Sequence, residues 1–179
     1  MKHFLTRNGL RLLIATAALA AFATASAQIP AQLVPPVGND EVKRANGDGV
    51  QIYVSVANPN APGQFIWAFV APNATLSNNG GHVFGHHFAG PTWQADNTGS
   101  SVAGTRLAGV TVDASAIPWL LLRGRDWSGH GMFSHVSYIQ RLDTVGGLAP
   151  SWVPTSAGIE VDVHYTATYV FFEPVSPHP

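Results

Sequence analysis

The chain has 179 residues and no cysteine, which excludes disulfides, thiolate metal sites and cysteine nucleophiles. It carries 9 basic and 10 acidic residues, a formal net charge of −1, and only 11% charged residues. This balance argues against a nucleic-acid-binding protein, and the 18 glycines and 13 prolines are typical of short strands joined by turns.

Residues 1–27 have the three parts of a secretory signal peptide. Lys2, Arg7 and Arg11 make the start basic, an apolar run follows, and the segment ends in Ala-Ser-Ala, which suits cleavage. We therefore expect a mature chain that starts at Gln28 and is exported to the periplasm or the extracellular medium. The apolar run is shorter than the about 20 residues that a membrane span needs, so no span is expected in the mature chain.

Cleavage removes three basic residues and no acidic one, so the formal charge changes from −1 to −4. No nucleic-acid partner is expected for such a chain. A dinucleotide site needs a glycine-rich turn between a strand and a helix, followed about 20 residues later by an acidic residue. That pattern does not occur, and no nucleotide cofactor is expected.

The first segment of the mature chain, residues 28–48, is rich in proline and polar residues and is predicted to form an extended arm. Residues 49–173 are predicted to form one all-β domain, a β-sandwich or a jelly-roll-like barrel, and residues 174–179 a C-terminal tail. The predicted strands are, in chain order, residues 50–56, 64–70, 81–88, 107–112, 119–123, 133–142 and 159–172.

Two of these strands show a clear period of two. In residues 50–56, aliphatic side chains occupy alternate positions, and Gln51, Tyr53 and Ser55 occupy the positions between them. In residues 159–172, one set of alternate positions is apolar, and the other set is mostly polar. One face of the last strand is therefore predicted to lie in the core and the other in water.

Four sequence blocks form a distinctive combination: GHHFAGPTW at residues 85–93, AIPWLLL at 116–122, the run 129–150, which contains VSYIQRLDTVGGLAP, and HYTATYVFF at 164–172. Together they resemble the family called domain of unknown function 3455, a group of mostly secreted bacterial and fungal proteins. The resemblance extends from about residue 49 to residue 172. It implies a family and does not imply a reaction.

Histidines are the main chemical candidates, because neutral imidazole is a common metal ligand and titrates near neutrality. His82, His86, His87 and His130 are candidate ligands of a divalent metal. In the predicted strand, His82 and His86 share a face and His87 points to the other. Three roles remain open for His87: a hydrogen bond to a backbone carbonyl that pins the following Gly-Pro turn, a metal ligand, or an acid–base group.

Aromatic and charged side chains supply candidates for ligand binding. Trp93 and Trp127 lie among polar turn residues and could contact a small molecule or a glycan, whereas Trp119, between Pro118 and Leu120, is predicted to lie in the core. Arg141 either pairs with a buried carboxylate or binds an anion. The candidate ligand-binding residues are His87, Trp93, Asp96, Trp127, His135 and Arg141.

The leading functional hypothesis is a noncatalytic binding or stress-associated module that acts in the periplasm or outside the cell. A histidine-metal enzyme of hydrolytic or redox type is one alternative, and a structural component of the cell envelope is another. The Gly-x-Ser-x-Gly elbow of serine hydrolases is absent. No catalytic residue is assigned, and the ligand and the oligomeric state are left open.

Overall fold

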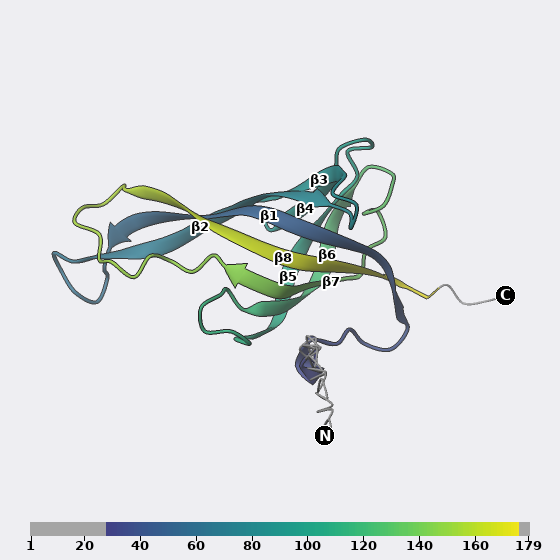
Figure 1. Cartoon of the computed structure of the whole chain (residues 1–179), viewed down its shortest axis with the longest axis horizontal. Coiled ribbons are helices and arrows are strands. Elements are labelled where there is room, and N and C mark those ends of the chain that lie inside the picture. The colour runs from purple at the N-terminus through teal and green to yellow at the C-terminus, as the bar shows by residue number, and fades with distance from the viewer. Residues whose placement is uncertain (1–27, 176–179) are drawn as a thin grey trace, which may run out of the picture.

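The computed structural model describes residues 28–175, and the predicted signal peptide lies outside them. Eight antiparallel strands follow one another in chain order around a closed barrel, and the last strand pairs with the first (Figure 1). A short 3-10 helix, η1 (Ala31–Leu33), precedes the barrel. The strands are β1 (Asn39–Ala57), β2 (Phe65–Ser77), β3 (Val83–Phe88), β4 (Thr92–Ala95), β5 (Ser101–Val110), β6 (Trp119–Ser128), β7 (Tyr138–Gly146) and β8 (Glu160–Pro174).

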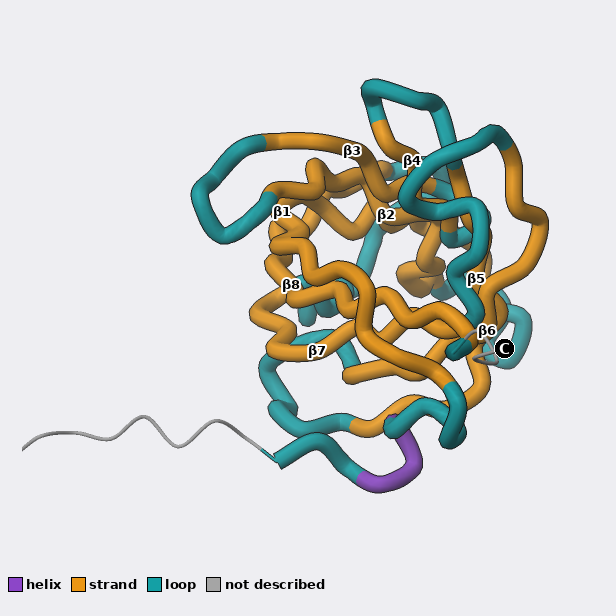
Figure 2. The backbone as a smooth tube through the Cα atoms, turned by 90° about the vertical axis from the view of Figure 1, so that its right-hand side faces the viewer, coloured by secondary structure: helices purple, strands orange, loops and turns teal. Residues whose placement is uncertain are grey.

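The prediction of a single all-β domain is confirmed, and of the two predicted architectures the structure has the barrel. Its strand order is not that of a jelly roll, because each strand pairs with its neighbours in sequence. Figure 2 shows the strands in a ring, with β1, β8 and β7 on one side and β5 and β6 on the other. In residues 28–175, no helix has the length and apolar character needed to cross a lipid bilayer.

The predicted extended arm is partly wrong, because β1 begins at Asn39 and not near residue 49. Residues 39–48 pair with β8, from Asn39 opposite Pro174 to Asp48 opposite Thr166. The prolines that argued against pairing end at Pro36, so every residue of this part of β1 has a backbone N–H for the ladder. Strand β4 was not predicted, because its 4 residues are too few for a reliable alternating pattern.

The barrel interior has a polar end and an apolar end. In β1 the side chains of Gln51, Tyr53 and Ser55 are buried, whereas the aliphatic residues between them are only partly buried. Near the opposite end, Phe133 from the β6–β7 connection packs on Phe171 of β8, with ring centroids 4.9 Å apart. Apolar side chains therefore fill that end.

A second apolar cluster lies on the outer face of β5 to β8, beneath the N-terminal segment. Leu33 of η1 is fully buried there against residues that include Trp119, the tryptophan predicted to lie in the core. The amide Nε2 of Gln140 in β7 donates to the carbonyl oxygen of Leu33 at 2.7 Å. Because the N-terminal segment covers the outer face of the barrel here, β6 has buried apolar side chains on both of its faces.

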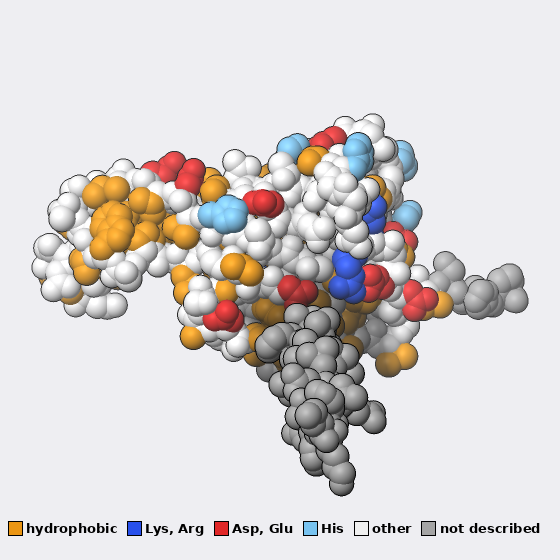
Figure 3. Space-filling model, viewed as in Figure 1, with side chains coloured by type: hydrophobic (Ala, Val, Ile, Leu, Met, Phe, Trp, Pro, Cys, Tyr) orange, Lys and Arg blue, Asp and Glu red, His pale blue; other side chains and the backbone are white. Residues whose placement is uncertain are grey.

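The β1–β2 hairpin extends beyond the barrel, to the left in Figure 1, and the β7–β8 connection packs against it. Trp67 Nε1 of β2 donates to the carbonyl oxygen of Trp152 at 3.0 Å, and the two indole rings meet edge to face. Hydrophobic side chains gather on this end of the molecule in Figure 3, and Ile66, Trp152 and Val153 are among the exposed ones. The connection is therefore held on the hairpin by both polar and apolar contacts.

We expect the Gly49→Ala substitution to destabilise the barrel by about 1–3 kcal/mol through overpacking. A Cβ at Gly49 would meet the backbone of Asn73 and Ala74 in the paired strand β2, and backbone atoms cannot give way as a side chain can. Gly80→Ala is the matched control, because its Cβ would meet only the Asn78 side chain, at 3.3 Å. Urea unfolding of both variants measures the difference, and equal stabilities would contradict this account of Gly49.

Candidate functional site

A cavity of about 560 Å³ opens at the polar end of the barrel, the end from which the β1–β2 hairpin projects. All eight strands contribute to its walls, together with Pro91 of the β3–β4 turn and Pro118 of the β5–β6 connection. Part of the lining is apolar, including Phe69, Leu120 and Leu122. The rest is polar, because the alternation of β1 turns its polar positions inward at this end.

Arg141 of β7 places its guanidinium in the cavity wall. Its Nε and Nη2 both donate to the carbonyl oxygen of Pro118, at 3.2 and 2.9 Å. In residues 28–175, no carboxylate lies within 4 Å of this guanidinium. Burial lowers the pKa of Arg141, and nearby tyrosine hydroxyls oppose that change. Pairing with a buried carboxylate, one of the two predicted roles, is therefore not found among these residues.

Two buried donors in the cavity lining have no hydrogen-bond partner within residues 28–175. They are Gln51 Nε2 and Trp93 Nε1, on side chains that are 3% and 1% exposed. A buried donor without a partner costs about 1–3 kcal/mol, so most proteins avoid such groups. Water or a bound molecule in the cavity can accept these two hydrogen bonds.

His87 of β3 is buried in the same lining, where its ring stacks on Trp93 with centroids 4.4 Å apart and planes 11° apart. Its Nδ1–H donates to the carbonyl oxygen of Thr92 at 2.9 Å, across the β3–β4 turn. Burial lowers the pKa of His87 to about 3, so the ring is neutral at pH 7 and its Nε2 is an acceptor. Of its three predicted roles, the structure shows the hydrogen bond that pins the turn.

Tyr53 and Tyr169 complete the polar wall, and Tyr165 contacts Tyr169. The hydroxyls of Tyr165 and Tyr169 in β8 lie 3.0 Å apart, and burial raises the pKa of both. Tyr53 donates its hydroxyl to the carbonyl oxygen of Gly147 at 2.7 Å. These tyrosines and Gln51 were not among the site residues predicted from the sequence. The available signal was the set of polar residues at alternate positions of β1, which the closure of the barrel turns inward.

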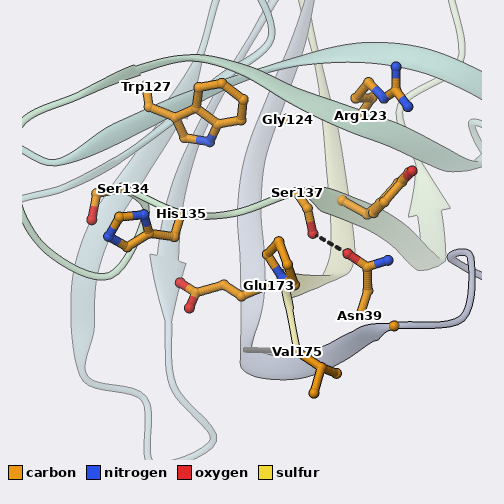
Figure 4. Close-up of a pocket in the computed structure, with 12 residues that line it drawn as sticks. Asn39, Arg123, Gly124, Trp127, Ser134, His135, Ser137, Glu173 and Val175 are labelled. Carbon is orange, nitrogen blue, oxygen red and sulfur yellow. Dashed lines mark hydrogen bonds between the residues drawn. The ribbon is translucent and has the colours of Figure 1, made fainter. Parts of the chain in front are cut away.

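Trp127 and His135 lie in a different place, an open groove of about 990 Å³ where β6 separates from β7 (Figure 4). Trp127 is 50% exposed, and its Nε1 donates to the carbonyl oxygen of Val136 at 2.8 Å. Across the groove, Ser137 donates its hydroxyl to Asn39 Oδ1 at 2.6 Å, the dashed line in Figure 4. These polar groups are already satisfied within the protein.

The structure therefore separates the six candidate ligand-binding residues. His87, Trp93 and Arg141 line the cavity, and Trp127 and His135 line the groove. The sixth candidate, Asp96, lies outside both sets of lining residues.

The candidate metal ligands are also separated. His86 Nε2 lies 3.3 Å from Asp96 Oδ1 in an exposed pair, while His87 is buried on the other face of β3, as its position in the sequence predicts. His82 precedes β3, and His130 lies in the β6–β7 connection. Over residues 28–175, no group of three or more His, Asp or Glu side chains is placed to hold a metal ion. The divalent-metal site stays a prediction.

Fold and site together define the class of protein: an up-and-down β-barrel with a mixed polar and apolar cavity in one mouth. The family described as Protein of unknown function (DUF3455) matches residues 36–173, and the chain belongs to this family. This confirms the resemblance seen in the four sequence blocks. The matched segment spans almost the whole barrel, from just before β1 to the end of β8. No curated protein and no solved structure matches the chain.

Proposed function

We propose that this chain is an exported, noncatalytic binding protein that holds a small organic molecule in the barrel mouth. The observation that carries the proposal is the pair of buried donors without partners, Gln51 Nε2 and Trp93 Nε1, in the lining of one cavity. Its volume of about 560 Å³ falls in the range of roughly 300–1,000 Å³ that is usual for small-molecule sites. The mixture of apolar walls and a few fixed polar groups is also usual for such sites.

The titratable groups of the cavity favour binding over catalysis. General acid–base chemistry works best with a group whose pKa lies near the working pH. His87 has a pKa of about 3 and uses its Nδ1–H to hold a turn, so it does not exchange protons near neutrality. Burial raises the pKa of Tyr169, and the lining contains no Asp or Glu.

We expect the cavity to bind a medium-sized amphipathic molecule. A larger side chain in the cavity wall is expected to weaken that binding. The protein is expressed with its own residues 1–27 and recovered from the periplasm or the medium, and its intact mass tests for cleavage before Gln28. Decanoate, decanamide and decan-1-ol serve as probes in isothermal titration calorimetry. At least one probe should bind with a Kd below about 1 mM, about −4 kcal/mol.

Leu120→Trp places a larger side chain in the cavity wall and should weaken binding of that probe at least tenfold. Leu107→Trp makes the same change at an exposed position of β5 outside the cavity lining and should leave the affinity unchanged. Circular dichroism of both variants establishes that the barrel is intact. If none of the three probes binds, or if both variants bind equally well, the proposed function is wrong.

A further inference from the structure

We propose that the natural ligand is an organic anion, in which a carboxylate or a similar head group contacts Arg141 and an apolar body contacts the cavity wall. This inference rests on the proposed binding function and adds the chemical class of the ligand. It depends on three observations: the sign of the charges around the cavity, the buried donors without a partner in its lining, and the apolar surface beside them.

The charges that line the cavity are all positive. Arg141 lies in the wall, and Arg106 of β5 lies in the lining with its side chain exposed. None of the lining residues is Asp or Glu, and no ion pair of Arg141 exists within residues 28–175. A cation that is partly removed from water without a counter-charge attracts an anion more strongly than an exposed cation does.

Buried donors without a partner lie at the polar end of the cavity, where the neutral His87 ring offers Nε2 as an acceptor. Gln51 Nε2 and Trp93 Nε1 are buried donors without partners. Tyr169 of the lining shares one hydrogen bond with Tyr165, which does not itself line the cavity, and this bond uses only one of the two hydroxyl protons. A carboxylate offers two oxygens with about four acceptor positions and no donor, so it complements this set better than an alcohol or an amide does.

The guanidinium of Arg141 is already oriented. Two of its five N–H groups donate to the carbonyl oxygen of Pro118, which fixes the plane of the group before a ligand arrives. A planar guanidinium in a fixed orientation suits the two parallel hydrogen bonds that an arginine forms with a carboxylate. Holding the side chain in place beforehand also lowers the entropic cost of binding.

The apolar part of the lining argues against a small inorganic anion. Phe69, Ile117, Leu120 and Leu122 line the same cavity as Arg141. An inorganic anion would leave these side chains uncovered, whereas the body of an aliphatic or aromatic acid would bury them and gain from the hydrophobic effect. The expected ligand is therefore an acid of moderate size with one anionic end.

Calorimetry with decanoate and decanamide, two probes of similar size that differ in charge, tests the inference on the exported protein at pH 7.5. We expect decanoate to bind at least tenfold more tightly than decanamide. Arg141→Met should remove this preference, lowering the affinity for decanoate at least tenfold and changing that for decanamide less than threefold. Arg123→Met is the charge-matched control, because Arg123 lines the separate groove and not the cavity.

Equal affinities of the wild-type protein for the two probes would overturn the inference and leave the proposed binding function standing. An unchanged preference for decanoate in Arg141→Met would overturn the role of Arg141. If that variant does not fold, Arg106→Gln at the exposed arginine of the lining replaces it and should reduce the preference at least twofold. Failure of every probe to bind would reject the proposed function itself.

Discussion

Acidification from pH 7.5 to pH 4 is expected to destabilise the barrel by about 3 kcal/mol through His87 alone. Burial, opposed by the bond to Thr92 and assisted by the charge of Arg141, lowers the pKa of His87 from 6.5 to about 3. Between about pH 3 and pH 6.5, His87 binds a proton in the unfolded chain but not in the folded chain. Stability is therefore complete above pH 6.5 and falls by about 1.4 kcal/mol per pH unit down to about pH 3.

Urea unfolding at pH 7.5, 6, 5 and 4 measures this dependence in the wild-type protein and in His87→Asn. The variant should be less stable at pH 7.5, because it loses the stack on Trp93, but its stability should fall less steeply with acid. His86→Asn is the matched control, since the neighbouring ring is exposed and points to the other face of β3. A His87→Asn variant with the full wild-type pH dependence would show that His87 is not the responsible group.

Trp93→Ala is expected to cost about 3–5 kcal/mol, the usual range for the loss of a large buried aromatic side chain. Trp93 packs against His87, Tyr169 and Phe171, with ring centroids 4.4, 5.5 and 6.1 Å away. Removing it would join a large void to the cavity in the barrel mouth and release His87 from its stack. Chemical denaturation at pH 7.5 measures the loss.

Trp127→Ala provides the comparison within the same chain. This indole is half exposed and makes one hydrogen bond, to the carbonyl oxygen of Val136, so its removal should cost about 1 kcal/mol. The sequence suggested similar roles for the two tryptophans, and the structure assigns one to the barrel interior and one to the surface. Equal losses of stability in the two variants would contradict this assignment.

Much of the local structure followed from the sequence. Alternation of apolar and polar residues in the last strand predicted the inward face of Tyr165, Tyr169 and Phe171, and all three are fully buried. The same period of two placed His86 and His87 on opposite faces of β3. The four sequence blocks were sufficient to identify the family. These features depend on residues that lie close together in the chain, so a short window contains the signal.

The interior of the barrel could not be predicted in the same way. Alternation in β1 showed two faces but not which of them would be inside, and the face with Gln51 and Tyr53 is the buried one. An amphipathic strand alone favours an aliphatic inner face, but closure of the barrel around a cavity reverses this preference at one end. That reversal depends on the pairing of β1 with β8, which joins opposite ends of the domain.

What the sequence determined by itself is therefore the all-β class, the family and the faces of individual strands. Only the tertiary structure brought Gln51, Trp93 and Arg141, from strands β1, β4 and β7, into the lining of one cavity. The partner of Arg141 likewise became visible only there, because the Pro118 carbonyl lies 23 positions away in the chain. The physical reason is that the ladder between strands fixes these distances through register and closure, which no local pattern of residues encodes.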